Sequence, residues 1–421
     1  MIEDKRGVLG KRNSKEVTEC QICANKNLKS VLFLGFLPPV NLMQKAGQAL
    51  SEQPAYPAEM LYCPECHLVQ LGSIVSAEIL FPAEYPYTSS TTKILRDNFN
   101  ELSQEVCSEF GLGKDDLVID VGSNDGNLLS HFKDYSKVLG ITPEDIGQIA
   151  VQRGIPTLFE YFNKRVVPKV LKDYSKARYI TATNVFAHID GIHEVVDSVL
   201  DLLKDDGIFI SESHYLLPLI ETLQYDTVYH EHLRYYSLTS LKYLLEKHGL
   251  EVIHAKRIPT HGGSIRVYAA RKGKHKVRPS VQEIMAQENK ANLNEKSLLA
   301  FRDQVLKSKL DLLAMMREIK GSGQKIYGIS APSRASTLIN YVGLDNAMID
   351  YVLEIDGSYK IGNYVPGTTI PIVNEKILFE NQPDYALLFS WHIADELIPK
   401  LKQKGFKGKF IVPLPEPRIV T

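Results

Sequence analysis

The chain has 421 residues, and 49 Lys and Arg against 50 Asp and Glu give it a formal net charge of −1 at pH 7. The length predicts two to three domains at roughly 150 residues each, and 44% hydrophobic with 24% charged residues excludes wholesale disorder. A chain this close to neutral lacks the basic field that holds nucleic acid. No apolar run reaches the ~20 residues that span a bilayer, and residues 1–16 have no apolar signal-peptide core. We therefore expect a cytoplasmic protein that binds neither nucleic acid nor membrane.

Four of the five cysteines form two pairs, Cys20-Gln-Ile-Cys23 and Cys63-Pro-Glu-Cys66. Two such pairs can complete a closed tetrahedral thiolate site, which is typical of structural zinc. The segment between the pairs is longer than in most zinc ribbons, and His67 is an alternative fourth ligand. Two coincidental pairs or a redox motif are other interpretations, but a redox pair needs a βαβ setting that neither pair has. We predict that a small domain folds around Zn²⁺ held by Cys20, Cys23, Cys63 and Cys66.

The segment from Phe81 to Thr92 is aromatic, rich in hydroxyl side chains and interrupted by proline. Loops of this kind often line clefts. The alternative is a linker between domains with two packed tyrosines.

The middle of the chain predicts an α/β domain that binds a nucleoside. A buried strand at 117–121 leads into Gly122-Ser-Asn-Asp-Gly126, whose glycines allow the backbone to approach a ligand closely. The spacing G-x-x-x-G differs from the G-x-G-x-x-G of dinucleotide-binding proteins, whose pyrophosphate needs a third close approach. It suits S-adenosylmethionine, where the loop passes the methionine and the ribose. An ordinary tight turn between strand and helix is the alternative.

Strands and helices continue to alternate after this turn, with strands at 137–141, 179–182 and 207–212 and helices at 146–153 and 193–203. The alternation predicts a doubly wound sheet. Its ligand should lie beyond the carboxyl ends of the strands. The polar residues at or near those ends are Asp120, Asn184 and Glu212.

The pattern breaks at the basic turn 271–279, which we interpret as a solvated connector. A helix over about 295–320 follows, with one apolar face that should join the core. A second α/β unit begins at Lys325, with a helix at 331–341 and strands at 349–353, 385–389 and 410–412. The two α/β units show no residue-level repeat.

The densest cluster of titratable side chains is the segment from Tyr225 to His232, and two further segments, Asn184 to His188 and His261-Gly-Gly-Ser264, adjoin predicted strands. Histidine is the usual general base, and a second histidine, a tyrosine or an arginine can donate to a developing oxyanion. Methylation at a carbon beside a ketone needs all of these groups: a base removes the α-proton, donors hold the enolate oxygen, and the carbon attacks a sulfonium methyl. A metal site, for which His-x-His is also typical, and structural histidines are the alternatives.

In their order and spacing these motifs resemble the three-domain sugar C-methyltransferases of deoxysugar biosynthesis, over nearly the whole chain. The matching segments are the paired cysteines and residues 85–90, 122–126, 184–188, 229–232, 261–264, 333–341, 366–371 and 384–396. The resemblance implies an α/β protein with three domains. These are a zinc-binding N-terminal domain over 1–80, a class I Rossmann-like methyltransferase domain over 81–273, and a second Rossmann-like domain over 274–421 that holds substrate without a dinucleotide.

The resemblance also implies the ligands and the roles of single residues. Structural Zn²⁺, S-adenosylmethionine as cosubstrate and a nucleotide-linked (dTDP or GDP) 4-keto-6-deoxy sugar are expected, the sugar being methylated at C-3 or, in some relatives, at C-5. His232 is the expected base, with Tyr229, Glu231 and His188 as supporting partners and Tyr85 or Tyr87 closing over the reactants. The expected cofactor contacts are Asp120, Gly122, Asn124, Asp125, Gly126, Thr142 and Asn184. The expected substrate contacts are Tyr87, His261 and Ser264, with Ser333, Arg334 and Lys360 at the diphosphate.

Two positions depart from the pattern of this family. Thr142 stands where relatives have an acid that accepts from the ribose hydroxyls, and Glu144 follows two residues later. Ser330 stands where relatives often have a second glycine, which further disfavours a dinucleotide in the third domain.

Several functions stay open beside this one: methylation of a non-sugar ketone, O-methylation of a sugar, a zinc-knuckle methyltransferase that binds RNA, and a binding module without catalysis. The low net charge argues against RNA binding. We expect a monomer, because no segment indicates dimerisation.

Overall fold

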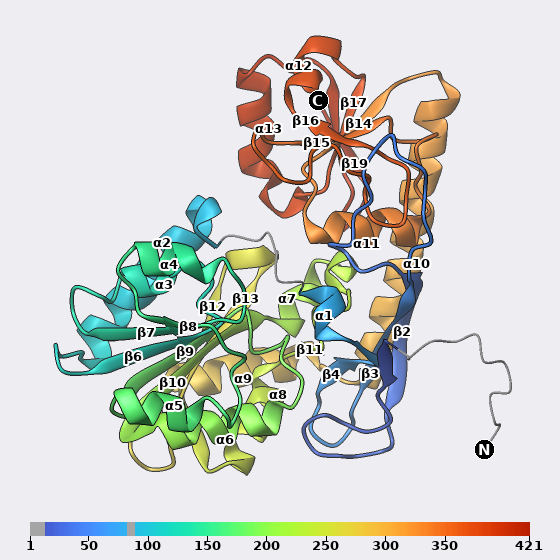
Figure 1. Cartoon of the computed structure of the whole chain (residues 1–421). Helices are drawn as coiled ribbons and strands as arrows, with labels where there is room; N and C mark the ends of the chain where they lie inside the picture. The colour runs from blue at the N-terminus through green and yellow to red at the C-terminus, as the bar shows by residue number, and fades with distance from the viewer. Residues whose placement is uncertain (1–12, 82–88) are drawn as a thin grey trace, which may run out of the picture.

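The structure is a computed structural model, which describes residues 13–81 and 89–421. These residues form three sheet-containing units that follow one another along the chain (Figure 1). Tyr85 and Tyr87 lie outside the described residues. Within the described part, no helix combines the length and the apolar composition that crossing a membrane requires.

The first unit is an antiparallel sheet in the order β11-β4-β3-β2, with a small separate pair of strands, β1 and β5. Inward and outward side chains alternate along β3, as expected when one face of a sheet packs on a core. The strand β11 comes from the middle of the chain and begins two residues after His232. The bounds are β1 Ser14–Glu16, β2 Lys29–Leu37, β3 Tyr56–Tyr62, β4 Val69–Leu71, β5 Ser73–Val75 and β11 Arg234–Tyr235.

The second unit is a seven-stranded sheet in the order β12-β13-β10-β9-β6-β7-β8. Five strands are parallel, and β13 pairs antiparallel with both β10 and β12. The strand order reverses beside β6, so the crevice for a ligand opens at the carboxyl ends of β6 and β9. The bounds are β6 Leu117–Val121, β7 Lys137–Ile141, β8 Thr157–Leu158, β9 Ala177–Thr183, β10 Leu203–His214, β12 Leu250–Ile258 and β13 Ser264–Arg271.

Helices cover both faces of this sheet (Figure 1). One core joins the sheet to α2, α3 and α4, and another joins its opposite face to α5, α6, α8 and α9. A doubly wound sheet, as predicted from the alternation of elements, is therefore confirmed. The bounds are α2 Lys93–Glu105, α3 Asn127–Ser130, α4 Gly147–Gln152, α5 Val167–Asp173, α6 Ile192–Leu202, α7 Leu216–Glu221, α8 Leu238–Lys247 and α9 Pro279–Ala291. The helix α9 was not indicated by the sequence.

The third unit is a six-stranded sheet in the order β16-β15-β14-β17-β18-β19, parallel except for the last strand. It has the predicted Rossmann-like alternation, with α11 following β14. The bounds are β14 Ile326–Ile329, α11 Ser333–Val342, β15 Tyr351–Glu354, β16 Ile372–Asn374, α12 Lys376–Asn381, β17 Tyr385–Leu388, α13 Ala394–Gln403, β18 Lys409–Val412 and β19 Arg418–Val420.

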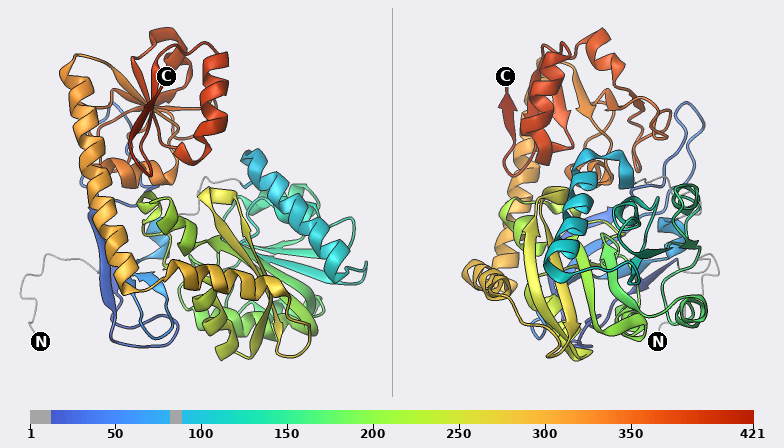
Figure 2. Two further views of the ribbon diagram at one scale, coloured as in Figure 1. Left: turned by 180° about the vertical axis from the view of Figure 1, so that it is seen from behind. Right: turned by 90° about the vertical axis from the view of Figure 1, so that its left-hand side faces the viewer.

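The helix α10 (Glu295–Gly321) is 27 residues long and runs alongside the first unit up to the third (Figure 2). Its N-terminus is closed by a capping box between Asn294 and Ser297, in which two otherwise unpaired donors are satisfied. The apolar face expected from the sequence is buried, which confirms it as core: Leu298, Phe301, Val305, Leu312, Met316 and Ile319.

The long spacing between the two cysteine pairs has a structural reason. Between β2 and β3 the chain leaves the first unit and pairs with the third: Ala46 N donates to Gly362 O at 2.9 Å, and Tyr364 N donates to Gln44 O at 2.8 Å. One buried core also runs from β2 and β3 through α10 into the third sheet. The domain boundaries at 80/81 and 273/274 stay a prediction, because this shared core crosses them.

Candidate active site and metal centre

The four paired cysteines form one compact cluster in the first unit. Their Sγ atoms all lie within 4.8 Å of one another, and three of the four residues are buried. Tetrahedral zinc with Zn–S bonds of about 2.3 Å places its sulfur atoms about 3.8 Å apart. The contacts Cys20–Cys66 at 3.3 Å and Cys23–Cys63 at 3.4 Å are far too long for disulfides and close to that spacing. The donor set therefore fits a closed structural zinc site.

His67 is not part of this cluster. Its Nδ1 is hydrogen-bonded to the Tyr62 hydroxyl at 2.6 Å, and Cys66 is the fourth residue of the cluster. Among residues 13–81 and 89–421, no other group of His, Cys, Asp or Glu has the spacing of a metal site. The His-x-His segment at 230–232 is therefore not a preformed metal centre.

The turn after β6 has the backbone shape that its glycines predict. Gly122 has φ +71°, and a Cβ built there would lie 2.7 Å from Cγ2 of Val185. Gly126 has φ +75°, and a Cβ there would lie 2.8 Å from Cβ of Ala150. Both positions combine a left-handed backbone with no room for a side chain, so glycine is required. Because these two residues have no side chain, the backbone after the carboxyl end of β6 can lie close to a ligand in the crevice.

The two polar residues inside this turn are held from outside it. Ser89 N donates to Asn124 Oδ1 at 2.9 Å, and Ser89 Oγ donates to Asp125 Oδ1 at 2.6 Å. Arg153 Nη1 donates to Asp125 Oδ2 at 3.1 Å. Asp125 is fully buried, so its carboxylate organises the turn and does not face solvent. Ser89 is a residue whose positioning role the sequence did not indicate.

The other expected cofactor residues lie at the same edge of the sheet. Asp120 is buried and accepts from Thr181 Oγ1 at 2.6 Å; burial raises the pKa of its carboxyl to about 7. Thr142 is fully buried and its hydroxyl donates to the Glu144 carboxylate. Asn184 has φ +57°, and its N–H donates to Glu212 O at 2.9 Å.

Glu212, which the sequence placed near a strand end, is held by a buried polar network. Arg266 Nε donates to Glu212 Oε1 at 2.5 Å, and Asn98 Nδ2 donates to Glu212 Oε2 at 2.9 Å. Arg266 also pairs with Glu105 at 3.0 Å. Because the carboxylate, guanidinium and amide satisfy one another, this buried network ties α2 to β10 and β13 behind the crevice.

The second feature of the site is a group of histidines beside these strand ends. The rings of His188 and His232 are 5.0 Å apart, and those of His214 and His232 are stacked at 6.2 Å. His261 belongs to the same group, because a proton on its ring would disfavour a proton on His188 and on His232. Burial lowers the pKa of His188 and of His261 to about 4 and that of His214 and His232 well below the usual 6.5. These side chains are therefore neutral at pH 7.

His232 has one defined tautomer. Its Nδ1 lies 2.8 Å from the carbonyl oxygen of Thr227. A carbonyl only accepts, so Nδ1 carries the proton and Nε2 keeps its lone pair. The Tyr229 ring packs against the imidazole at 4.2 Å between centroids. A neutral, oriented imidazole of this kind can act as a general base.

The neighbours of His232 in sequence have different surroundings. His230 is buried, and its Nε2 donates to Tyr56 O at 3.1 Å in the first unit, which is a structural contact. Glu231 is also buried, and its Oε1 accepts from Asn41 Nδ2 at 2.7 Å. Leu233 N donates to Ala187 O at 3.1 Å, which holds the segment beside the carboxyl end of β9.

The third unit reaches this group through Arg334, at the start of α11. Its Nη1 donates to His392 Nδ1 at 2.9 Å, and its Nη2 donates to Gln224 Oε1 at 3.1 Å. Lys360 donates to the carbonyl of Ala331 at 2.5 Å. Ser333 is partly buried at the N-terminus of α11.

Ser264, another expected substrate contact, lies in the second unit at the start of β13. It is fully buried, and its hydroxyl donates to Thr260 O at 3.0 Å.

His214 and Gln224 complete the group, although the sequence analysis did not select them. His214 Nε2 lies 3.1 Å from Gln224 Oε1. The signal that could have found His214 is its place two residues after Glu212, at the carboxyl end of a predicted strand. No pattern in the sequence indicated Gln224.

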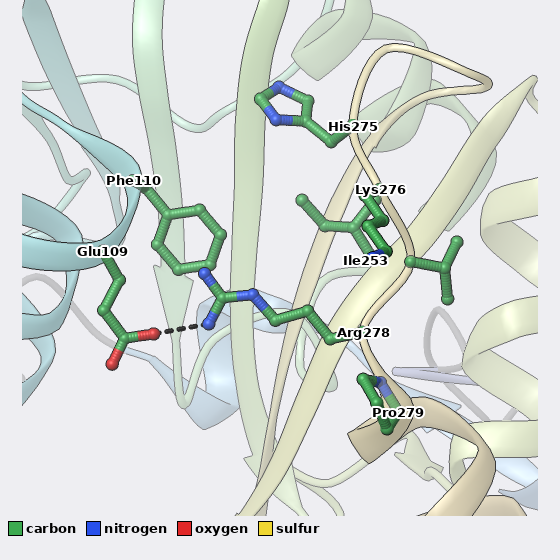
Figure 3. Close-up of a pocket in the computed structure, with 8 residues that line it drawn as sticks. Glu109, Phe110, Ile253, His275, Lys276, Arg278 and Pro279 are labelled. Carbon is green, nitrogen blue, oxygen red and sulfur yellow. Dashed lines mark hydrogen bonds and ion pairs between the residues drawn. The ribbon is translucent and has the colours of Figure 1, made fainter.

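A hollow of about 360 Å³ lies elsewhere, between Phe110, Ile253 and the basic turn (Figure 3). Arg278 lies over the Phe110 ring at 4.2 Å and pairs with Glu109. The hollow adjoins the first half of β12 and the loop after β13, which is the end of the sheet opposite to the histidines. We therefore do not assign the active site to it.

Replacing Gly122 with alanine should lower the affinity for S-adenosylmethionine at least tenfold, because a left-handed alanine costs about 1–2 kcal/mol and its Cβ would contact Val185 at 2.7 Å. Isothermal titration calorimetry measures this. Gly154→Ala is the matched control: its φ is +76°, but nothing lies within 4 Å of its Cβ. Equal affinities for both variants and the wild type would contradict the assignment of this turn.

Three family models match the chain in succession: a zinc binding domain over residues 20–81, a methyltransferase domain over 87–255 and a C-methyltransferase C-terminal domain over 259–415. The C-methyltransferase NovU of Streptomyces niveus is 32% identical over 415 residues, which cover 97% of this chain and 98% of the relative.

Solved structures are similar over part of the chain. Magnesium protoporphyrin IX methyltransferase (ChlM) from Synechocystis PCC 6803 with bound SAM aligns with 42% of this chain and 79% of that chain, at 12% identity and a TM-score of 0.33. The N-methyltransferase NodS from Bradyrhizobium japonicum WM9 aligns with 43% of this chain and 99% of that chain, at 10% identity and a TM-score of 0.33. The family assignment rests instead on the three consecutive models and on the near full-length relative: the chain belongs to the C-methyltransferases, as an S-adenosylmethionine-dependent enzyme with a zinc-binding N-terminal domain.

Proposed function

We propose that the chain methylates a carbon beside the ketone of a nucleotide-linked 4-keto-6-deoxyhexose, and that this carbon is C-3. The proposal rests mainly on the orientation and the protonation state of the His232 ring. Its Nδ1 is bound to the Thr227 carbonyl at 2.8 Å, and its pKa lies well below 6.5 because the ring is buried among other histidines. An imidazole that is unprotonated and oriented before substrate binds has a free lone pair on Nε2, which can accept the proton that enolisation releases. Methylation of a hydroxyl needs no donors for an enolate oxygen, because no enolate forms.

The reaction uses the groups of the site in order. His232 Nε2 removes the proton from the carbon beside the ketone, and the electrons of that C–H bond form the C=C bond of an enolate. His188 and Tyr229, the two rings nearest His232, supply donors for the enolate oxygen. The enolate carbon then forms a bond to the sulfonium methyl while the S–CH3 bond breaks, so that S-adenosylhomocysteine leaves. His232 afterwards releases its proton to solvent.

S-adenosylmethionine supplies an electrophilic methyl group. We assign its place to the crevice beside Gly122, Asn184 and Asp120. Glu144 accepts from Thr142, so an acid still lies near the position where relatives have one, and we propose that Glu144 accepts from the ribose hydroxyls. Its exposure is intermediate, so its carboxylate can reach a ligand.

The test is incubation with S-adenosylmethionine and a panel of dTDP- and GDP-linked 4-keto-6-deoxyhexoses, read by mass spectrometry and NMR. We expect one sugar to gain a single methyl group on carbon, and its α-proton to exchange with deuterated water in the presence of enzyme. A methyl group on oxygen without such exchange would indicate an O-methyltransferase. Donor binding without any product would show that the acceptor is not a sugar of this class.

A further inference from the structure

Arg334 is a residue of the third unit whose guanidinium lies among residues of the second. Only 8% of its side chain is exposed. Besides its contacts with His392 and Gln224, its Nη2 donates to His261 O at 3.4 Å, and its Nε lies 3.5 Å from Asp226 Oδ2. All three of its nitrogens are therefore engaged with protein groups, which leaves little capacity to bind a phosphate.

These contacts determine the tautomers of two histidines. Arginine has no acceptor, so His392 Nδ1 must be the acceptor and carry no proton. Gln224 Oε1 accepts from Arg334 Nη2, and Gln224 Nε2 donates to Gly262 O at 2.6 Å, so the orientation of the amide is fixed. Since Gln224 Oε1 can only accept, His214 Nε2 carries the proton in their hydrogen bond at 3.1 Å.

The charge of Arg334 also acts on the whole group. Its counter-ion Asp226 lies on the Nε side of the guanidinium and is held by Trp391 Nε1 at 2.8 Å. The two Nη atoms, on the other side, face the histidines. Burial lowers the pKa of His214, His232, His261 and His392, and the positive charge of Arg334 lowers each of them further, that of His392 to about 3. The titratable or charged groups that face His232 are His188, His214, Tyr229, Tyr235, His261 and Arg334.

We propose that Arg334 is a positioning residue through which the third unit keeps the histidines of the active site neutral and in single tautomers. This inference rests on the proposed function, since it assigns His232 as the base. It replaces a diphosphate contact as the role of Arg334: the third unit does not only hold substrate but completes the catalytic group of the second.

The decisive variant is Arg334→Met, which keeps the length of the side chain and removes its charge and donors. In the free enzyme, long-range ¹H–¹⁵N NMR of the histidine rings should show higher pKa values and a mixture of tautomers for His214. In kinetics, the acid limb of the pH profile of kcat/KM should move to higher pH, because the base then becomes protonated at a higher pH. A shift of one pH unit lowers kcat/KM about tenfold at a pH below both pKa values and leaves it unchanged well above them, so the profile is measured down to the lowest pH at which the enzyme stays folded. Arg302→Met, on the exposed face of α10, is the control and should change neither readout.

Arg334→Lys separates charge from geometry. Lysine keeps the positive charge but cannot reach His392 and Gln224 together, so we expect the acid limb to stay in place and kcat to fall. This conservative variant also keeps the test valid if Arg334→Met does not fold, because a single His214 tautomer in Arg334→Lys would contradict the proposal.

A diphosphate ligand would behave differently. Arg334→Met would then raise KM equally at every pH and leave the histidine resonances of the free enzyme unchanged, which would overturn the proposal. If the wild-type enzyme methylated no sugar at all, the proposed function would fail, yet the NMR titration of the free enzyme would still decide the role of Arg334.

Discussion

The variant His232→Gln is expected to lose most of its turnover, with kcat about 10²–10⁴-fold lower, the range that general-base catalysis typically contributes. Glutamine can preserve a hydrogen bond to the Thr227 carbonyl but has no basic lone pair at the position of Nε2. Affinity for S-adenosylmethionine should be unchanged, because the cofactor crevice is built from other residues. Enzyme-dependent exchange of the α-proton in deuterated water should disappear together with turnover.

The control for this variant is His275→Gln, in the exposed basic turn, where the ring contacts the Asp206 carbonyl at 2.9 Å. This substitution removes a histidine that lies outside the group formed by His188, His214, His232 and His261, and it should leave turnover at the level of the wild type. If His232→Gln retained full turnover, His232 would not be the base. Loss of turnover with α-proton exchange retained would assign His232 to a later step.

The second large effect is expected for Cys63→Ala. The variant should contain no zinc and should unfold at a lower temperature, because structural zinc in zinc-finger peptides contributes roughly 10–16 kcal/mol to folding. Zinc content by mass spectrometry of metals and thermal unfolding by circular dichroism measure the two effects.

Loss of zinc should also abolish activity, because the zinc knuckle is linked to the catalytic segment. Gln21 N donates to Gln70 Oε1 at 2.9 Å beside the first cysteine pair. Gln70 lies in β4, which pairs with β11, and Leu71 N donates to Leu233 O at 3.0 Å, one residue after His232. The position of His232, the proposed base, therefore depends on the metal-stabilised unit.

Cys107→Ala is the matched control for zinc. This cysteine is half-buried after α2 and outside the four-cysteine cluster, so its removal should affect neither zinc content nor turnover. A folded, fully active Cys63→Ala protein without metal would contradict a structural role for zinc.

The features that could be predicted from the sequence are those that depend on local patterns. The two C-x-x-C pairs predicted the metal cluster because each pair needs only a tight turn. The glycines at 122 and 126 predicted the turn after β6 because a left-handed, closely packed backbone requires glycine; that this turn binds the cofactor stays a prediction. The alternation of strands and helices predicted the doubly wound sheet, and the spacing of apolar residues predicted the buried face of α10. Each of these signals lies within a short stretch of chain.

Features that depend on contacts between distant segments could be seen only in the folded chain. Gln224 and Arg334 are 110 residues apart, and no periodicity or spacing relates a buried arginine of one sheet unit to the amide of another. The same holds for β11 joining the first sheet and for Ser89 binding the cofactor turn. Hydrogen bonds between such distant residues depend on how the three units pack. The tautomers of the histidines could therefore be inferred only from the folded chain.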